Sequence, residues 1–193
     1  MPNNSHSEPA NNENHSVELT TPRLKLRKFR ATDAEAMFRN WANDDEVTRN
    51  LTWRTHADVS ETQGVIDNWL NGYAYPRFYL WAIELDGELI GSIGCAQPDL
   101  NLGEIKFGYA LSRAYWGHGY MTEALTAVIN HLFALGYNRI TANHYLENPA
   151  SGRVMEKCGL RFEGIIRDGG KDGYGNYRDA KQYAILKKDL LDV

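Results

Sequence analysis

The spacing of apolar residues along the chain changes repeatedly between a period of two and a period near 3.6, which predicts strands interleaved with helices. In chain order the pattern predicts a strand over 23–29, helices over 31–44 and 60–72, strands over 78–85, 88–96 and 103–111, a helix over 121–135, a strand over 138–146, a helix over 148–159, and strands over 160–168 and 177–188. Helices that flank a mixed sheet in one domain indicate an α/β (α+β) fold.

Three local signals are the clearest in this pattern. Asp86-Gly87 lies between two β-rich stretches and predicts a tight hairpin turn. Asn148 followed by Pro149 predicts the N-cap and first position of a short helix. An apolar stripe ahead of Gly136 predicts an amphipathic helix. Its members are Met121, Ala124, Leu125, Val128, Ile129, Leu132 and Phe133.

Composition narrows the class of protein. The chain has 193 residues, 42% hydrophobic and 24% charged, which suits a single folded domain. A net charge of −4 gives no excess of basic residues that would indicate binding to nucleic acid or to a membrane surface. Cys95 and Cys158 form no CxxC pattern, so we expect no metal site, no disulfide framework and a cytoplasmic location. The polar, Asn-rich residues 1–18 predict a disordered tail before one domain over 19–193.

Residues 114–124 (AYWGHGYMTEA) carry the most specific chemical signal. Gly117 and Gly119 flank His118 where a predicted strand gives way to a helix, whose first amide groups lack intrahelical partners. Such a turn binds phosphate, and His118 would contribute its N–H rather than its ring. A plain tight turn stays open as an alternative. A dinucleotide site would need glycine in place of Thr122, and a P-loop would need Gly-Lys-Ser/Thr, so a pyrophosphate site for a ligand such as coenzyme A remains.

The same residues resemble the GNAT superfamily of N-acetyltransferases, whose turn reads [RQ]-x-x-G-x-[GA]. Both small positions match, whereas Ala114 stands where that motif has Arg or Gln. In this respect the turn is similar to the RimJ/RimL branch, which acetylates N-terminal residues of ribosomal proteins. Residues 147–164 (ENPASGRVMEKCGLRFEG) resemble a second segment of that branch, and the resemblance spans about residues 19–190. It implies a mostly antiparallel central sheet flanked by helices, with acetyl-CoA as co-substrate and no metal.

The resemblance also implies which residues bind acetyl-CoA. Backbone amides of the glycine turn would hold the pyrophosphate, and backbone groups at the end of the preceding strand would pair with the pantetheine arm. Asn148 would bind the arm or the acetyl end. The implied set is Tyr109, Ala110, Leu111, Gly117, His118, Gly119, Tyr120, Met121, Thr122 and Asn148.

Acetyl transfer from a thioester needs a neutral amine and an acid for the departing thiolate. An α-amine with a pKa of ~8 is closer to that state at neutral pH than a lysine at ~10.4. Glu104 is predicted as the base, because alternation places it on the face of Gly108 and Ala110, where small residues leave room for a ligand. Many members of the family also have a glutamate at this strand position. The alternative is a solvated glutamate that balances Lys106.

Ser151 is predicted as the acid, since the branch has a serine three residues after the asparagine and Met155 stands where other members have a tyrosine. Tyr145 is a second candidate acid and, with Trp53, a candidate acceptor-binding residue. Local hydrogen bonding by Ser151, N-capping by Asn148 and core packing by Trp53 are the alternatives.

We therefore expect an acetyl-CoA-dependent N-acetyltransferase that acetylates a protein N-terminal α-amine or a small primary amine by direct attack in a ternary complex. Two alternatives stay open: a non-catalytic acyl-CoA-binding or regulatory module of the same fold, and an aminoglycoside or polyamine acetyltransferase, which predicts an acidic acceptor pocket. A homodimer is also left open. These motifs do not identify the acceptor, because fold does not determine function.

Overall fold

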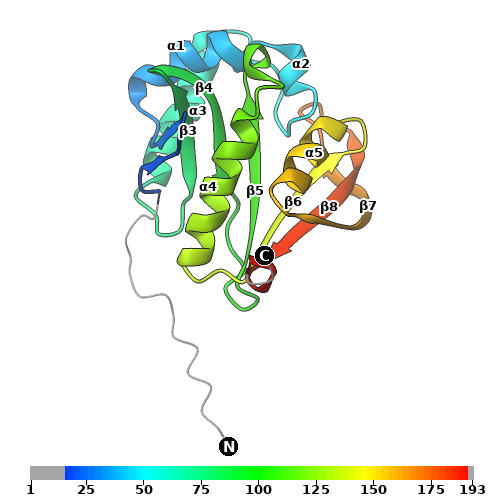
Figure 1. The fold of residues 1–193 in the computed structure, drawn as a ribbon. Helices are drawn as coiled ribbons and strands as arrows, with labels where there is room; N and C mark the ends of the chain where they lie inside the picture. The colour runs from blue at the N-terminus through cyan, green and yellow to red at the C-terminus, as the bar shows by residue number, and fades with distance from the viewer. Residues whose placement is uncertain (1–15, 191–193) are drawn as a thin grey trace, which may run out of the picture.

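The computed structural model describes residues 16–190, so residues 1–15 of the predicted tail and residues 191–193 lie outside it. The strands are β1 (Leu19–Thr20), β2 (Lys25–Arg27), β3 (Leu80–Leu85), β4 (Glu88–Cys95), β5 (Glu104–Leu111), β6 (Arg139–Tyr145), β7 (Arg161–Lys171) and β8 (Tyr177–Leu186). They form one sheet in the order β1-β2-β3-β4-β5-β6-β8-β7 (Figure 1). The α-helices are α1 (Ala34–Met37), α2 (Asp45–Thr48), α3 (Val59–Gly72), α4 (Tyr120–Ala134) and α5 (Pro149–Lys157).

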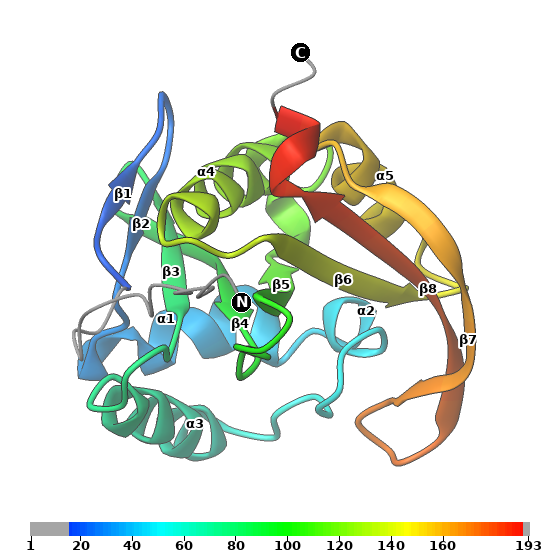
Figure 2. The same cartoon turned by 90° about the horizontal axis from the view of Figure 1, so that it is seen from below.

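Helices cover both faces of the sheet, with α4 and α5 on one face and α1 and α3 on the other (Figure 2). On the first face, Ile105 and Phe107 of β5 belong to the core that contains the α4 stripe. On the second face, Ala110 of β5 belongs to the core that contains Trp41 and Ile66. Strand β5 therefore presents alternate side chains to two separate cores, as a period of two requires.

Strands β5 and β6 are the one parallel pair within the described sheet, and they pair over a short length. Their register covers only Glu104↔Arg139, Ile105↔Ile140 and Lys106↔Thr141. Beyond these positions β5 stays paired with β4 as far as Leu111, and β6 stays paired with β8 as far as Tyr145. The two strands therefore diverge toward their C-terminal ends, as Figure 1 shows.

Most of the predicted elements are confirmed. Every residue of the predicted α4 stripe is buried, and Gly136 follows the helix with φ of 99°. Asp86 and Gly87 have φ of 49° and 85°, as a type I′ hairpin turn requires. The predicted helix over 31–44 is instead divided into a 3-10 turn at Ala31–Asp33, the single turn of α1, and a π-helical segment at Phe38–Ala42. The wider π turn accommodates the consecutive buried residues Trp41 and Ala42.

The folded part of the chain begins before residue 19. Ser16 Oγ donates to Phe78 O at 2.8 Å and accepts from Leu80 N at 3.1 Å, while Trp81 Nε1 donates to Val17 O at 2.7 Å. These contacts add residues 16 and 17, which the composition assigned to the tail, to the β3 side of the sheet. Within residues 16–190, no helix has both the length and the apolar character needed to cross a membrane.

Candidate active site

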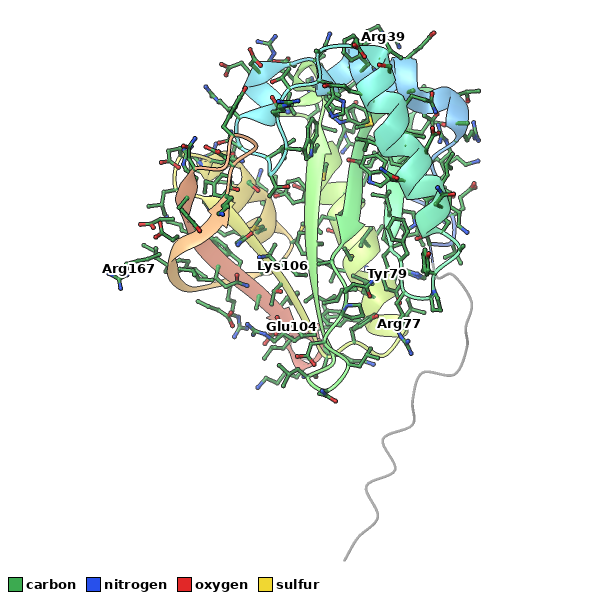
Figure 3. The ribbon with its side chains drawn as sticks, turned by 180° about the vertical axis from the view of Figure 1, so that it is seen from behind. Arg39, Arg77, Tyr79, Glu104, Lys106 and Arg167 are labelled. Atoms are coloured by element: carbon green, nitrogen blue, oxygen red, sulfur yellow. The ribbon has the colours of Figure 1, made fainter. Side chains whose placement is uncertain are left out.

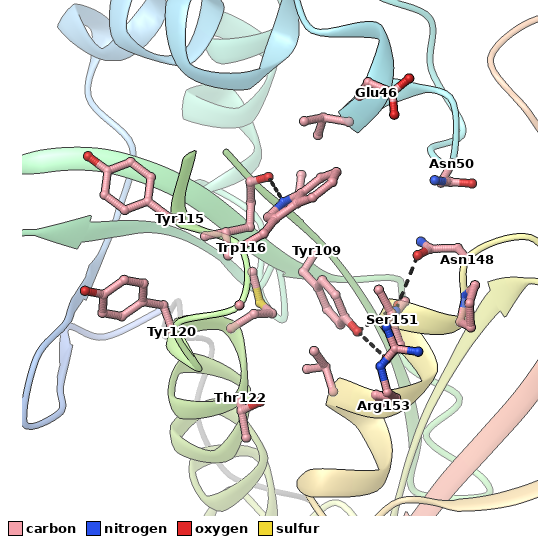
Figure 4. A pocket seen from close by; sticks show the side chains of 18 of the residues that line it. Glu46, Asn50, Tyr109, Tyr115, Trp116, Tyr120, Thr122, Asn148, Ser151 and Arg153 are labelled. Carbon is pink, nitrogen blue, oxygen red and sulfur yellow. Dashed lines mark hydrogen bonds between the residues drawn. The ribbon is translucent and has the colours of Figure 1, made fainter. Parts of the chain in front are cut away.

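Two cavities meet where β5 and β6 diverge. The first, of 380 Å³, is lined by α2 and the loop after it, by the start of α4 and by α5 (Figure 4). The second, of 420 Å³, is lined by Trp53, by Trp69 of α3, by β4 and β5, and by the β7–β8 hairpin. The residues that line both cavities are Asn50, Leu51, Tyr109, Ala110, Asn148 and Ser151. Since α4 and α5 cover one face of the sheet and α3 the other, the cavities approach these shared residues from opposite faces.

The glycine turn forms one wall of the first cavity. Gly117 and Gly119 both have φ of 81°, a left-handed conformation that favours glycine, and Gly119 is the N-cap of α4. None of the amide groups of residues 117–122 donates a hydrogen bond to another described residue. A Cβ at Gly117 would have no atom within 4 Å, so the space beside the turn is open. The turn therefore offers unpaired N–H groups and the positive end of the α4 dipole to an anion.

Arg23 holds this turn from outside the cavity. Its Nε pairs with Glu123 Oε2 at 2.6 Å, and one terminal nitrogen donates to His118 O at 3.0 Å. Its guanidinium also lies 4.5 Å from the centroid of the Tyr120 ring, and the His118 ring stacks on Tyr120 from 5.7 Å. The His118 side chain thus packs on a neighbouring ring.

Cationic side chains of α5 line the opposite wall of the first cavity. Arg153 and Lys157 lie one turn apart, are exposed, and make no hydrogen bond or ion pair with another described residue. Between the walls, Trp116 Nε1 donates to Leu111 O at 2.8 Å, which fixes the indole across the end of β5. The first cavity therefore offers unpaired amides and two cations to an anionic ligand, while Glu46 and Glu147, which also line it, pair with Arg49 and Arg178.

Three polar side chains gather where the two cavities meet. Asn148 caps α5, with its side-chain oxygen accepting from Ser151 N at 3.4 Å. Ser151 Oγ lies 2.8 Å from Tyr109 Oη, which also donates to Ser151 O at 3.0 Å (Figure 4). Because one hydroxyl proton of Tyr109 cannot serve both bonds, Ser151 donates to Tyr109 when Tyr109 donates to the carbonyl. The structure thus brings together Tyr109, Asn148 and Ser151 of the predicted site.

Sequence reasoning assigned Tyr109 only a backbone role, and its hydroxyl is a further functional group. Burial raises the pKa of Tyr109 above its ordinary value, with a smaller opposing effect from the Ser151 hydrogen bond. The hydroxyl therefore stays protonated throughout the neutral range. The sequence indicated only that the Tyr109 side chain lies on the face of β5 opposite Gly108. The contact of its hydroxyl with α5 depends on tertiary packing, which the sequence pattern does not show.

The second cavity has a floor of small residues and aromatic walls. The floor belongs to the β4 and β5 face that includes Ser92, Gly94, Gly108 and Ala110. A Cβ at Gly108 would have no atom within 4 Å, which shows how much open space lies above this part of the sheet. The walls are Trp53, Trp69 and Tyr145. The cavity therefore combines room beside the backbone with large apolar surfaces.

The β7–β8 hairpin closes one side of the second cavity. Tyr145 Oη donates to Lys171 O at 2.7 Å, and a Cβ at Gly170 would lie 2.9 Å from the Tyr145 ring. A Cβ at Gly173 would lie 2.6 Å from Trp53 O and closer still to the adjoining carbonyl carbon and amide nitrogen. Both glycines therefore permit backbone approaches that a side chain would prevent. Trp53 and Tyr145, which the sequence singled out, line this cavity together.

The acetyltransferase (GNAT) domain model matches residues 23–161, well over half of the chain. The chain belongs to the GNAT acetyltransferase family. It is similar to the uncharacterized N-acetyltransferase p20 of Bacillus licheniformis, at 34% identity over 176 residues, which cover 89% of this chain and 97% of that protein. The chain also matches the ribosomal protein uS5 alanine N-acetyltransferase of Escherichia coli over a shorter stretch. That match is 36% identical over 62 residues and covers 32% of each chain. Mycobacterium smegmatis RimJ in complex with CoA-disulfide shares the fold with a TM-score of 0.78 and 27% identity, covering 86% of this chain and 83% of that one.

These matches confirm the GNAT fold and the resemblance drawn from the two motifs, and the chain is an N-acetyltransferase. The glycine turn and the start of α5, which carry the two motifs, both line the first cavity. The roles of the individual site residues stay predictions.

Glu104 lies apart from the other predicted residues of this GNAT enzyme. It stands at the start of β5, below Lys106 in Figure 3, and lines neither cavity. Its carboxylate accepts from Arg139 Nε at 2.8 Å and from Thr141 Oγ1 at 3.4 Å, while Arg139 also pairs with Glu163 at 2.5 Å. A rise of about 3.3 Å per residue puts its Cα roughly 16 Å from that of Tyr109. Its role as a base stays a prediction, and the geometry gives it an ion-pair role.

Two further titratable side chains, His144 and Cys158, have structural partners. His144 donates from Nδ1 to Tyr145 O at 2.7 Å, and its buried Nε2, which lies against Gly152, makes no hydrogen bond within the described residues. Burial lowers its pKa, so the ring is neutral. Cys158 Sγ packs 3.4 Å from Thr122 O, and burial raises the pKa of its thiol. Among residues 16–190, no three His, Cys, Asp or Glu side chains are grouped to hold a metal ion.

Proposed function

We propose that this enzyme transfers the acetyl group of acetyl-CoA directly to a primary amine, either a protein N-terminal α-amine or a small amine, within a ternary complex. The observation that carries the proposal is the meeting of two cavities at Tyr109, Asn148 and Ser151, where β5 and β6 diverge. Two substrates that enter from opposite faces of the sheet would touch there, and holding them together supplies much of the rate.

The first cavity fits acetyl-CoA. The unpaired amides of residues 117–122 suit the pyrophosphate, and Arg153 and Lys157 suit the remaining phosphate charge. Lys106 O accepts from Ala96 N at 2.7 Å, so the backbone groups of Lys106 point toward β4. Backbone direction alternates along a strand, so the N–H and C=O of Tyr109, three residues later, point toward the gap beside β6. These groups can pair with the amides of the pantetheine arm, as the family resemblance implies. The name of the related RimJ structure, a complex with CoA-disulfide, supports this placement.

The reaction forms a bond between the amine nitrogen and the acetyl carbon and breaks the bond from that carbon to sulfur. The amine loses a proton and the thiolate gains one. An α-amine with a pKa of ~8 is partly neutral at physiological pH, so its deprotonation needs little assistance. Ser151 would donate its hydroxyl proton to the thiolate, and Tyr109 beside it would return a proton to Ser151. Tyr109 would then regain a proton from solvent, which also takes up the proton lost by the amine.

A turnover screen tests the proposal. Thiol release from acetyl-CoA is measured against N-terminal peptides, polyamines and aminoglycosides, with both substrate concentrations varied. Intersecting reciprocal plots for a peptide or small amine support direct transfer, whereas parallel plots indicate a covalent acetyl-enzyme. Calorimetric binding of acetyl-CoA with no turnover on the whole panel would instead favour the non-catalytic module. A cytoplasmic location and a homodimer stay predictions.

A further inference from the structure

Lys106 is a cation on the floor of the second cavity and forms no ion pair with any residue of the described part of the chain. It lies on the same face of β5 as Gly108 and Ala110, is half-buried, and lines the cavity floor (Figure 3). It makes no hydrogen bond or ion pair with another described residue. Burial lowers its pKa, and the charge of Glu104 opposes that shift only in part. A partly desolvated ammonium that makes no direct ion pair is unfavourable in the free enzyme.

Three carboxylates on segments next to the cavity are already paired with arginines. Glu104 pairs with Arg139 at 2.8 Å, and Arg178 pairs with both Glu147 at 3.0 Å and Asp172 at 3.3 Å. No Asp or Glu lines the second cavity within the described residues. With His144 neutral, Lys106 supplies the charge of this cavity, and that charge is positive. An acceptor with two or more ammonium groups is therefore poorly matched to it.

The inference rests on the proposed function, in which the second cavity holds the acceptor. We propose that the Lys106 ammonium binds an anionic group of the acceptor, so that the amine acetylated by this enzyme also carries a carboxylate. The pairing would give Lys106 its missing counter-ion and offset the repulsion between Lys106 and an incoming ammonium. It therefore selects an acidic amine over polyamines and aminoglycosides.

Strand geometry sets the distance between the anion and the reacting nitrogen. Tyr109 is three positions after Lys106, which corresponds to about 10 Å along β5 at 3.3 Å per residue. A flexible lysine side chain covers part of this distance. The carboxylate of a small amino acid and an acidic side chain near a peptide N-terminus are both within reach, and they share the same recognition chemistry.

The test uses matched acceptors that differ only in charge. One arm compares peptides that begin Ala-Glu, Ala-Gln and Ala-Lys, and a second compares glutamate with glutamine amide. We expect kcat/KM to be higher for the acidic member of at least one arm by about tenfold or more, the effect typical of a hydrogen bond to a charged group. The arm that shows the preference identifies the source of the carboxylate.

Three variants assign the preference to Lys106. Lys106→Met keeps the aliphatic chain and is expected to abolish the preference for acidic acceptors, while leaving the KM for acetyl-CoA unchanged and the thermal midpoint no lower than that of the wild type. Lys106→Arg keeps the charge and is expected to keep the preference. Lys188→Met, which removes an exposed lysine outside both cavities, is the matched control and should behave like the wild type.

The outcomes separate this inference from the proposed function. Equal rates on acidic and neutral acceptors in the wild-type enzyme overturn the inference and leave acetyl transfer intact. Loss of turnover on neutral acceptors in Lys106→Arg also overturns it, because that result marks Lys106 as a base. Absence of turnover on every acceptor in the wild-type enzyme overturns the proposed function itself.

Discussion

The contact between Gly173 and the Trp53 loop offers a test of how the second cavity, the proposed acceptor site, is closed. A Cβ at residue 173 would lie 2.6 Å from Trp53 O, whereas ordinary contact begins at 3.4 Å, and two further backbone atoms are closer still. Gly173→Ala therefore requires the hairpin and the loop to separate by about 1 Å. A displacement of that size near a reacting group can lower a rate by ~100-fold. We expect kcat/KM for the acceptor to fall roughly 10- to 100-fold.

Steady-state kinetics and calorimetry measure this effect on each substrate separately. The Kd for acetyl-CoA should change by less than about twofold, because Gly173 lies on the acceptor side and does not line the first cavity. Gly175→Ala is the control for backbone strain in the same turn: at φ of 87° an alanine strains the backbone, yet its Cβ would have no atom within 4 Å. Wild-type acceptor kinetics in Gly173→Ala would refute the idea that this contact positions the acceptor wall, and so would equal losses in both variants.

Other predictions address the remaining groups. Ser151→Ala should lower kcat about 100-fold with little change in the KM for acetyl-CoA, as loss of a general acid requires, and unchanged kcat would remove the serine from the mechanism. Replacing Arg153 and Lys157 together by Ala should raise the KM for acetyl-CoA and make that KM depend less on salt. Initial rates measured at several NaCl concentrations between about 50 and 300 mM test this. Glu104→Gln should keep its kcat/KM between about pH 6 and 9 if its ion pair is its role, and lose it if it is the base. The hydrogen bond from Arg139 lowers the pKa of Glu163 below its ordinary value of 4.5. The stabilising effect of this pair is therefore complete above pH 4.5 and is lost as the pH falls through the lowered pKa. Glu163→Gln should accordingly reduce stability by ~0.5 kcal/mol at pH 7, a difference that shrinks in thermal melts as the pH falls below 4.5.

The sequence predicted those features that depend on neighbours along the chain. The α4 stripe, the Asp86-Gly87 turn and the Asn148 cap follow from helical spacing, backbone conformation and local hydrogen bonds, and each is present. The division of the helix over 31–44 was missed, because a π turn depends on how Trp41 and its neighbours pack between α3 and the sheet. Periodicity alone contains no such information.

The candidate site shows the same division between local and tertiary information. The alternation of side chains along β5 predicts the face on which Glu104 lies. It does not show how far along the strand the two cavities meet. That distance is set by the point at which β5 and β6 part, after Lys106. The contact of the Tyr109 hydroxyl with α5 and the cavity beside Lys106 also depend on where β5 and β6 separate. Neither could be predicted from the spacing of residues in the sequence.

The parting of β5 from β6 also links the stability of the fold to the supply of its co-substrate. Backbone groups of β5 beyond Lys106 form an internal sheet edge without a strand beside it, and the pantetheine arm would take the place of that strand. A ligand that binds only the folded state adds about 2.7 kcal/mol at a concentration one hundred times its Kd. For a domain of this size that corresponds to a rise of roughly 5–10 °C in the unfolding midpoint. The thermal lifetime of the enzyme would then vary with the acetyl-CoA level of its surroundings.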